Sequence, residues 1–316
     1  MQIHHIKNLP LLILRKVVNT FFGLFAKKIG KANLREAKVI KEVNNIINRK
    51  FNSKSDIEAT NFYLQRIRNM LLKGNIRKFI RYDVVLNSLF VQNRFYLIKE
   101  YKYVLKNLKN KKNINEDKIG SPIPFFLNFD TSGNRVHHLY HILKFSSFFG
   151  NKDLKNIDII FDWGGGYGSM CHLFYRLGFK GTYIIYDFDE LYFLQLYYLK
   201  SLGHKVNFGN KIKKNHINLI NNKNSIKKYL LNNKIKNKLF VSCWAMSETE
   251  KSLRTQFDYV FKLFDNILLG FQEKYFGINN FRYFKSRVKL KKNRKILIEK
   301  NNNNFENHYY IFTTKS

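Results

Sequence analysis

A glycine-rich turn that follows an apolar segment constrains the fold more than any other feature of this sequence. Residues 162–168 read Asp-Trp-Gly-Gly-Gly-Tyr-Gly, and we predict a strand over residues 158–163. Glycines let the backbone turn sharply and approach a ligand closely, and the free amides at the start of the next helix can face that ligand. The pattern therefore predicts a strand, a turn and a helix that together bind a nucleotide-like cofactor.

The spacing of the glycines separates the cofactor classes. A NAD site requires Gly-x-Gly-x-x-Gly/Ala, and counting from Gly164 puts Ser169 at the third place. The alternative pattern, acid-x-Gly-x-Gly-x-Gly, is typical of S-adenosylmethionine (SAM) sites and is matched throughout, by Asp162, Gly164, Gly166 and Gly168. Asp162 can then engage the amino end of the methionine, directly or through water, and we expect Gly165 and Tyr167 to contact the same cofactor. No Gly-Lys-Ser/Thr follows the turn, which excludes a P-loop.

A carboxylate ends the next predicted strand, over residues 182–187. Asp187 lies roughly twenty residues beyond the last glycine, where a carboxylate can accept both ribose hydroxyls of an adenosine. Phe188 can pack on the adenine or equally belong to the core. A further predicted strand, over residues 239–243, brings Ser242 and Trp244 to the same edge of the sheet, so we expect both to border the cofactor.

Two kinds of residue are candidates for a general base. Glu248 follows the fourth strand, where it can take a proton from an attacking hydroxyl or, equally, cap the next helix. His138 on a predicted helix over residues 136–148 is the alternative base, and we expect its neighbours His137 and His141 to contact substrate. A metal site would need a supporting carboxylate, for which Asp130 is the only near candidate, so we expect no metal.

Strands and helices alternate from residue 157 onward, which predicts an α/β fold. We expect a Rossmann-like sheet of seven mostly parallel strands, closed by a C-terminal antiparallel hairpin. It should form a cofactor-binding domain over residues 121–316, after a helical region over residues 1–120. The predicted strands are 158–163, 182–187, 205–208, 239–243, 266–272, 295–299 and 309–313; the predicted helices are 33–51, 56–72, 82–108, 136–148, 170–177, 191–202, 224–231 and 252–264. The Asn- and Lys-rich residues 211–238 are expected to form a solvated connection.

The charge and the N-terminus bear on partners and location. Lys and Arg total 57 against 22 Asp and Glu, a formal charge of +35, which favours phosphates, nucleic acid or an anionic membrane but can also reflect AT-biased coding. Residues 9–29 carry an apolar stripe with basic residues, typical of a helix on a membrane surface or packed on its own protein. No segment has some 18 uninterrupted apolar residues, and the two cysteines, Cys171 and Cys243, suggest buried thiols in a reducing compartment. We therefore expect a cytoplasmic protein in which residues 9–29 pack on the protein itself, with contact to the inner face of the membrane as the alternative.

The motifs resemble those of a family of sugar O-methyltransferases from bacterial surface-polysaccharide gene clusters. The resemblance rests on residues 162–168, 186–202, 242–248, 269–272 and 279–280 and runs from about residue 130 to the C-terminus. Family members often carry Glu at the place of Asp162 and Leu or Ile at that of Trp163. The resemblance implies SAM-dependent methyl transfer to a sugar hydroxyl in lipopolysaccharide or capsule synthesis, with a sugar, nucleotide-sugar or lipid-linked glycan as partner. Gln272 and Asn280 carry amides suited to sugar hydroxyls.

Three other functions agree with part of the sequence. An RNA or DNA methyltransferase is favoured by the charge, but such enzymes typically carry an Asn/Asp-Pro-Pro-aromatic run after the fourth strand, where Ser-Cys-Trp-Ala stands at residues 242–245. A NAD-linked sugar-modifying enzyme is disfavoured by Ser169 and by the terminal hairpin. A non-catalytic membrane- or RNA-binding scaffold is disfavoured by the intact glycines and by Asp187.

Overall fold

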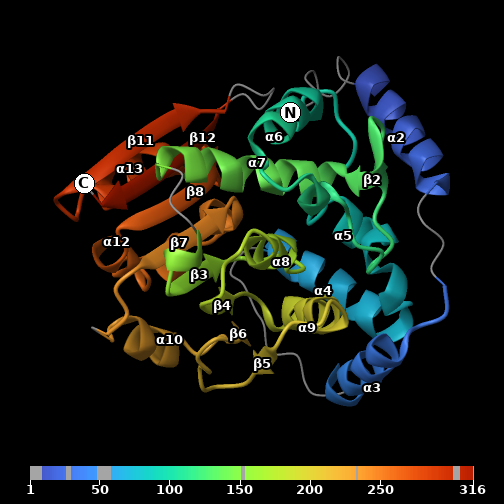
Figure 1. Cartoon of the computed structure of the whole chain (residues 1–316), viewed down its shortest axis with the longest axis horizontal. Helices are drawn as coiled ribbons and strands as arrows, with labels where there is room; N and C mark the ends of the chain where they lie inside the picture. Colours follow the sequence, from blue (N-terminus) through green and yellow to red (C-terminus); the bar gives the residue numbers. More distant parts are fainter. Residues whose placement is uncertain are drawn as a thin grey trace.

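The computed structural model describes residues 9–25, 30–47, 58–150, 154–232, 234–301 and 307–315. An eight-stranded sheet forms the centre of the protein (Figure 1). Its strands are β3 Ile159–Trp163, β4 Thr182–Tyr186, β5 Val206–Phe208, β6 Ile217–Leu219, β7 Lys238–Cys243, β8 Asn266–Gln272, β11 Arg294–Lys300 and β12 His308–Lys315. Their order is β11-β12-β8-β7-β3-β4-β6-β5; β12 runs antiparallel to both of its neighbours, β11 and β8, and all other neighbouring pairs are parallel. The predicted Rossmann-like, mostly parallel sheet with a C-terminal hairpin is confirmed.

The eighth strand, β6, lies within the segment that the sequence predicts to be a solvated connection. That expectation is wrong for residues 217–219, all of which are buried between β4 and β5. The polar side chain of Asn218 can be buried here because its hydrogen-bonding groups have partners. It accepts from the Lys213 amide at 2.7 Å and donates to the Lys213 carbonyl at 3.0 Å. The predicted strand at 205–208 therefore forms the sheet edge, as β5.

Alternate residues along each strand face two hydrophobic cores, as the twofold period of a strand requires. On β3, Ile160 points into one core, with α7, α8 and α9, and Phe161 points into the other. The helices of the domain are α7 Gly133–Phe148, α8 Ser169–Arg176, α9 Asp189–Ser201, α10 Lys223–Leu230, α11 Lys251–Thr255, α12 Val260–Leu263 and α13 Asn280–Val288. The predicted helix 252–264 is interrupted between α11 and α12, and α13 was not predicted.

The N-terminal region is helical, with one interruption that the sequence did not predict. Its helices are α2 Leu9–Leu24, α3 Leu34–Ile47, α4 Glu58–Lys73, α5 Asp83–Leu86 and α6 Leu97–Asn107; short 3-10 turns are η1 Ile76–Arg81, η2 Lys111–Ile114 and, later, η3 Leu154–Asn156 and η4 Ala245–Glu248. The expected helix 82–108 is broken because tertiary bonds replace helical ones: Asn134 accepts from the Val91 amide, and Asn93 accepts from the Phe126 amide. Asn93 thereby holds a hairpin of β1 Pro124–Phe125 and β2 Asn128–Ser132, which was also not predicted.

The helical region and the sheet share one hydrophobic core. A single buried cluster joins Val43 of α3 and Phe79 of η1 to Leu173 of α8 and Phe312 of β12. A domain boundary near residue 120 stays a prediction. Within the described residues, no helix is long and apolar enough to cross a membrane.

Candidate functional site

The glycine-rich turn connects β3 to α8 and uses backbone conformations that other residues rarely adopt. Gly164, Gly166 and Gly168 have φ values of +78°, +57° and +96°. A Cβ atom on Gly164 would lie 2.0 Å from the Cβ of Ala245, and one on Gly165 would lie 2.7 Å from the Cγ2 of Ile185. Glycine is thus required here both for the turn and for the close approach of neighbouring strands.

Asp187 lies next to this turn, at the end of β4, and a helix residue joins the two. Gln195 of α9 is fully buried, and its Nε2 donates to the Gly166 carbonyl at 2.8 Å and to the Asp187 carboxylate at 3.0 Å. The Phe188 amide donates to the other oxygen of Asp187. Burial, with a smaller contribution from the charge of Asp162, raises the pKa of Asp187 to about 8. The sequence motifs that indicate Asp187 and the turn gave no indication that Gln195 connects them.

Asp162 and Tyr167 lie within the protein rather than on the open side of the turn. Asp162 is 2% exposed and accepts the Tyr183 hydroxyl at 2.8 Å, while burial raises its pKa to about 7. Tyr167 is buried against Phe79, and its hydroxyl accepts from Asn134. Both side chains support the turn, and their contact with the cofactor, directly or through water, stays a prediction.

The end of β7 borders the turn on its other side. Ser242 is 1% exposed and donates to the Trp163 carbonyl, so its side chain braces the strands and is not available to a ligand. Trp244 is half-buried and has a positive φ of +66°, which is uncommon outside glycine. Such strain at the carboxyl end of a parallel strand is typical of a binding site.

Glu248 ends the 3-10 turn η4 that follows Trp244. It does not cap the next helix, because α11 begins at Lys251 with Glu250 as its N-cap. The Glu248 side chain is exposed and makes no hydrogen bond or ion pair with the described residues. The surrounding protein raises its pKa above the ordinary 4.5, and solvent limits the rise. This carboxylate is therefore free to accept a proton.

A helix of the N-terminal region covers the same edge of the sheet. Burial raises the pKa of Tyr63 on α4, and the charges of Asp187, Glu190 and Glu248 raise it further, which places all three acids around this tyrosine. Arg68 of α4 bonds Glu190 at 2.5 Å. A Cβ on Gly166 would lie 3.7 Å from Leu89. The helical region thus forms one wall of the site, which no sequence motif indicated.

The three histidines of α7 line the back of the site. His137 bonds the buried Glu100 at 2.8 Å, and His141 bonds the Tyr310 hydroxyl at 2.8 Å. Both rings are almost fully buried and pack against Trp244, and a substrate contact for either histidine stays a prediction. His138 is half-buried and bonds Ser169 at 3.2 Å, and burial lowers its pKa to about 3.

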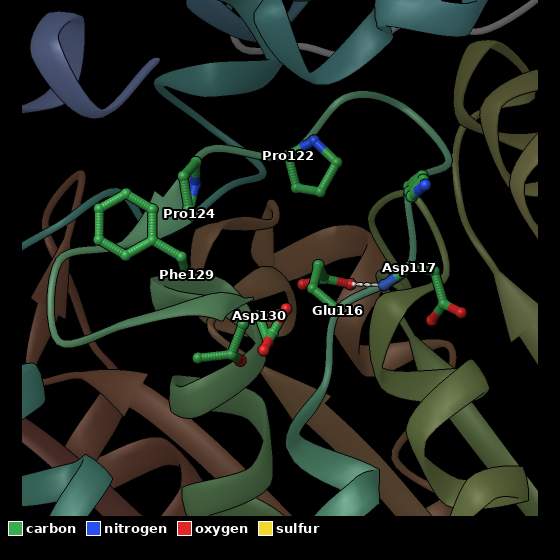
Figure 2. A pocket seen from close by; sticks show the side chains of 8 residues that line it. Glu116, Asp117, Pro122, Pro124, Phe129 and Asp130 are labelled. Carbon is green, nitrogen blue, oxygen red and sulfur yellow. Dashed lines mark hydrogen bonds between the residues drawn. The ribbon is translucent and has the colours of Figure 1, made fainter. Parts of the chain in front are cut away.

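The carboxylate considered for a metal site does not join these histidines. Asp130 lines a separate small pocket with Glu116, Asp117 and Phe129, where a dashed line marks the bond from the Asp117 amide to Glu116 (Figure 2). Arg135 pairs with both Glu116 and Asp117, so their charges are compensated. Among the residues that the structure describes, no group of three metal-binding side chains converges.

An open cleft of about 360 Å³ lies beyond the end of β8. It is lined by Gln272, Glu273, Lys274, Asn307 and His308. The indole Nε1 of Trp244 donates to the Nδ1 of His308 at 2.6 Å, so the cleft adjoins the end of β7. Gln272 is half-buried and faces this cleft, as expected for a substrate contact, although that role stays a prediction.

Asn280, expected to contact substrate, is fully buried and braces the segment that carries Glu248. Its Oδ1 accepts from the Nη1 of Arg254 at 2.5 Å, and its Nδ2 donates to the carbonyls of Ser247 and Gln272. Arg254 is itself fully buried and donates to the carbonyls of Ser247 and Thr249 on either side of Glu248. The pair Arg254 and Asn280 fixes the position of this carboxylate, and a substrate contact for Asn280 stays a prediction.

Asn280→Ala is expected to lower the free energy of unfolding by about 2–3 kcal/mol, because it leaves a buried guanidinium and two carbonyls short of partners. Asn279→Ala is the matched control. Asn279 only caps α13 by accepting from the Arg282 amide, and its loss should cost about 1 kcal/mol. Urea denaturation measures both; equal losses would contradict the bracing role.

No protein-family model and no curated protein matches this chain. Solved structures give distant likenesses. The magnesium protoporphyrin IX methyltransferase of Synechocystis, with bound S-adenosylhomocysteine (SAH), is 12% identical with a TM-score of 0.37 and covers 70% of this chain and 100% of its own. An SAH-bound methyltransferase of Podospora anserina is 9% identical with a TM-score of 0.34, covering 85% and 100%. TrmK of M. capricolum, also with SAH, is 14% identical with a TM-score of 0.30, covering 53% and 67%. Structural similarities this weak do not indicate a function for this chain.

Proposed function

We propose that this chain is a SAM-dependent methyltransferase that acts on a hydroxyl group of a sugar during the synthesis of surface glycan in the cytoplasm. The observation that carries the proposal is the junction of β3 and β4, where Gln195 ties the turn at Gly166 to Asp187. A carboxylate beside a glycine-rich turn suits the ribose and the amino-acid ends of SAM. No pyrophosphate-binding spacing is present.

The residues around the turn fit this cofactor. Gly164 and Gly166 keep the backbone open where side chains would intrude, and the buried Oε1 of Gln195 has no partner of its own among the described atoms. Asp187 would hold the ribose hydroxyls, the turn amides would face the methionine end, and Phe188 could lie along the adenine. When bound, SAM supplies a methyl group on a sulfonium that is activated toward displacement.

Glu248 is the base that the geometry favours. Its carboxylate is exposed at the same edge as Asp187, and the Arg254 and Asn280 brace holds it there. It would take the proton of the acceptor hydroxyl as the oxygen attacks the methyl carbon in line with the departing sulfur. Positioning of the acceptor is expected to supply most of the acceleration.

The pH dependence of the rate distinguishes Glu248 from His138. A carboxylate base must be ionised, so the rate of the wild-type protein should rise with pH through an apparent pKa between 4.5 and about 7. Glu248→Gln should lower kcat by about 100-fold or more, remove this rise and leave SAH affinity unchanged. Stopped assays from pH 5 to 9 provide the measurement.

His138→Gln is the comparison. Because burial lowers the pKa of His138 to about 3, a histidine base would already be neutral throughout this range and would give a flat profile. A flat wild-type profile, with a large loss of kcat only in His138→Gln, would transfer the role of base to that histidine.

The acceptor class rests on the cleft beyond β8 and on the family resemblance. Amide, carboxylate and imidazole groups line this cleft, and such planar polar groups suit sugar hydroxyls. RNA is the second candidate, since the charge of +35 favours a polyanion. An assay of labelled methyl transfer from SAM distinguishes the sugar acceptor from RNA. It offers nucleotide-sugars and lipid-linked glycans in some reactions and total RNA in others. Label in RNA alone would refute the sugar assignment and leave methyl transfer standing.

A further inference from the structure

One face of α2 is apolar and points outward. Leu14, Val17, Phe21 and Leu24 follow one another at helical spacing and are 47%, 59%, 53% and 78% exposed. Large apolar side chains this exposed are unusual in a row, because burying each would stabilise the protein. No other part of the described chain buries this row, which makes it a candidate contact surface.

The helix is nevertheless fixed to the protein by its opposite face. Asn19 is 4% exposed, accepts from the Asn93 amide at 2.9 Å and donates back to the Asn93 carbonyl. Gly23 lies so close to Arg81 that a Cβ there would meet its guanidinium at 2.6 Å. The helix thus has a defined orientation, and its outward row is a property of the folded protein.

The hairpin of β1 and β2 extends this apolar face. Phe129 is 47% exposed and contacts the rings of Phe22 and Phe25 on α2, at 5.6 and 5.5 Å between centroids. Figure 2 shows the Phe129 ring beside Pro124, apart from the carboxyl groups of Glu116 and Asp117. Leu127 at the hairpin tip is 49% exposed. Helix and hairpin form one face at the edge of the molecule (Figure 1).

The charge of the sequence that carries this face indicates its partner. Residues 1–35 contain no Asp or Glu, but they contain Arg15, Lys16, Lys27, Lys28 and Lys31 among their basic residues. Two copies of a chain with a formal charge of +35 would repel each other across such a face, whereas an anionic surface would attract it. A basic segment beside exposed aromatic and aliphatic side chains is typical of a helix that lies in the plane of a bilayer.

We propose that α2 and the β1–β2 hairpin form a docking surface for an anionic lipid bilayer. The apolar row would enter the boundary between headgroups and acyl chains, and the basic residues would contact the anionic headgroups. This inference does not depend on methyl transfer, so either can fail alone.

Cosedimentation of the full chain with vesicles tests the inference. Vesicles are either pure phosphatidylcholine or three parts phosphatidylcholine to one part phosphatidylglycerol. We expect the wild-type protein to bind the anionic vesicles at least tenfold more tightly. Phe21→Ser combined with Leu24→Ser should weaken that binding at least tenfold without altering net charge. Phe62→Ser combined with Leu231→Ser removes comparably exposed apolar groups, 62% and 48%, from other helices and should change it less than twofold.

Three results would overturn the inference. If the wild-type protein does not bind anionic vesicles, this face does not bind lipid. Equal binding by both double variants shows attraction through charge alone. A wild-type dimer in light scattering that becomes monomeric in Phe21→Ser with Leu24→Ser, with no vesicle binding, shows that a second copy covers the face.

Discussion

Gly164→Ala is expected to lower methyl transfer by on the order of 100-fold, the usual consequence of a displacement of about 1 Å in a catalytic site. The added Cβ would lie 2.0 Å from the Cβ of Ala245, so the turn or the start of η4 must move. These two segments carry the cofactor amides and Glu248, respectively. Overpacking should also lower the free energy of unfolding of this variant by roughly 1–3 kcal/mol, in addition to the cost of placing alanine at a positive φ.

Gly277→Ala provides the control for the backbone. Gly277 has the same φ of +78°, and no atom lies within 4 Å of its would-be Cβ. Alanine there should cost about 1 kcal/mol of stability from the left-handed conformation alone and should leave SAH affinity unchanged. If Gly164→Ala behaves like Gly277→Ala in both assays, the close packing of the turn against η4 is not needed for function.

Asp187→Ala is expected to weaken SAH binding by roughly 30-fold, about 2 kcal/mol, which is the value of charge-assisted hydrogen bonds to a ribose. Calorimetry with SAH measures the loss. Because burial raises the pKa of Asp187 to about 8, the carboxylate forms as pH rises, so wild-type affinity should increase with pH through this region. The alanine variant should show no such increase.

Asp189→Ala provides the comparison for a nearby carboxylate. Asp189 lies two residues further along, in the first turn of α9, and accepts from Asn221. Above pH 8, where Asp187 is ionised, the removal of Asp189 changes the net charge as much as Asp187→Ala does. It should alter SAH affinity less than threefold, the range of about 0.5 kcal/mol for a surface change. A comparable loss in both variants would mean that Asp187 acts through general charge and not through ribose contact.

Much of the sheet could be predicted because most of its strands can be recognised from a short stretch of sequence. The glycine turn at 164–168 and the acid at 187 follow apolar runs, and parallel strands bring such ends to one edge. β6 escaped detection because it is three residues long and its central residue is Asn218, whose burial depends on bonds to Lys213 and to the distant Tyr183. The interruption of the helix after α5 also depends on distant partners, Phe126 and Asn134.

The site was predictable in its backbone and less so in its side chains. Position along a strand indicates which edge a residue occupies, but not whether its side chain is open to solvent. Ser242 and Asn280 have the right positions and chemistry, and tertiary hydrogen bonds use both for bracing. Gln195 and Tyr63 lie on helices whose register against the sheet only the folded structure provides.

The central claim is that the turn between β3 and α8 holds SAM. Titration of the wild-type chain with SAH and with NADH by calorimetry tests it most directly. We predict saturable binding of SAH and no binding of NADH, because the glycine spacing and Asp187 suit an adenosine without a pyrophosphate. Binding of NADH without SAH, or of neither ligand, would contradict the proposal that this chain is a methyltransferase.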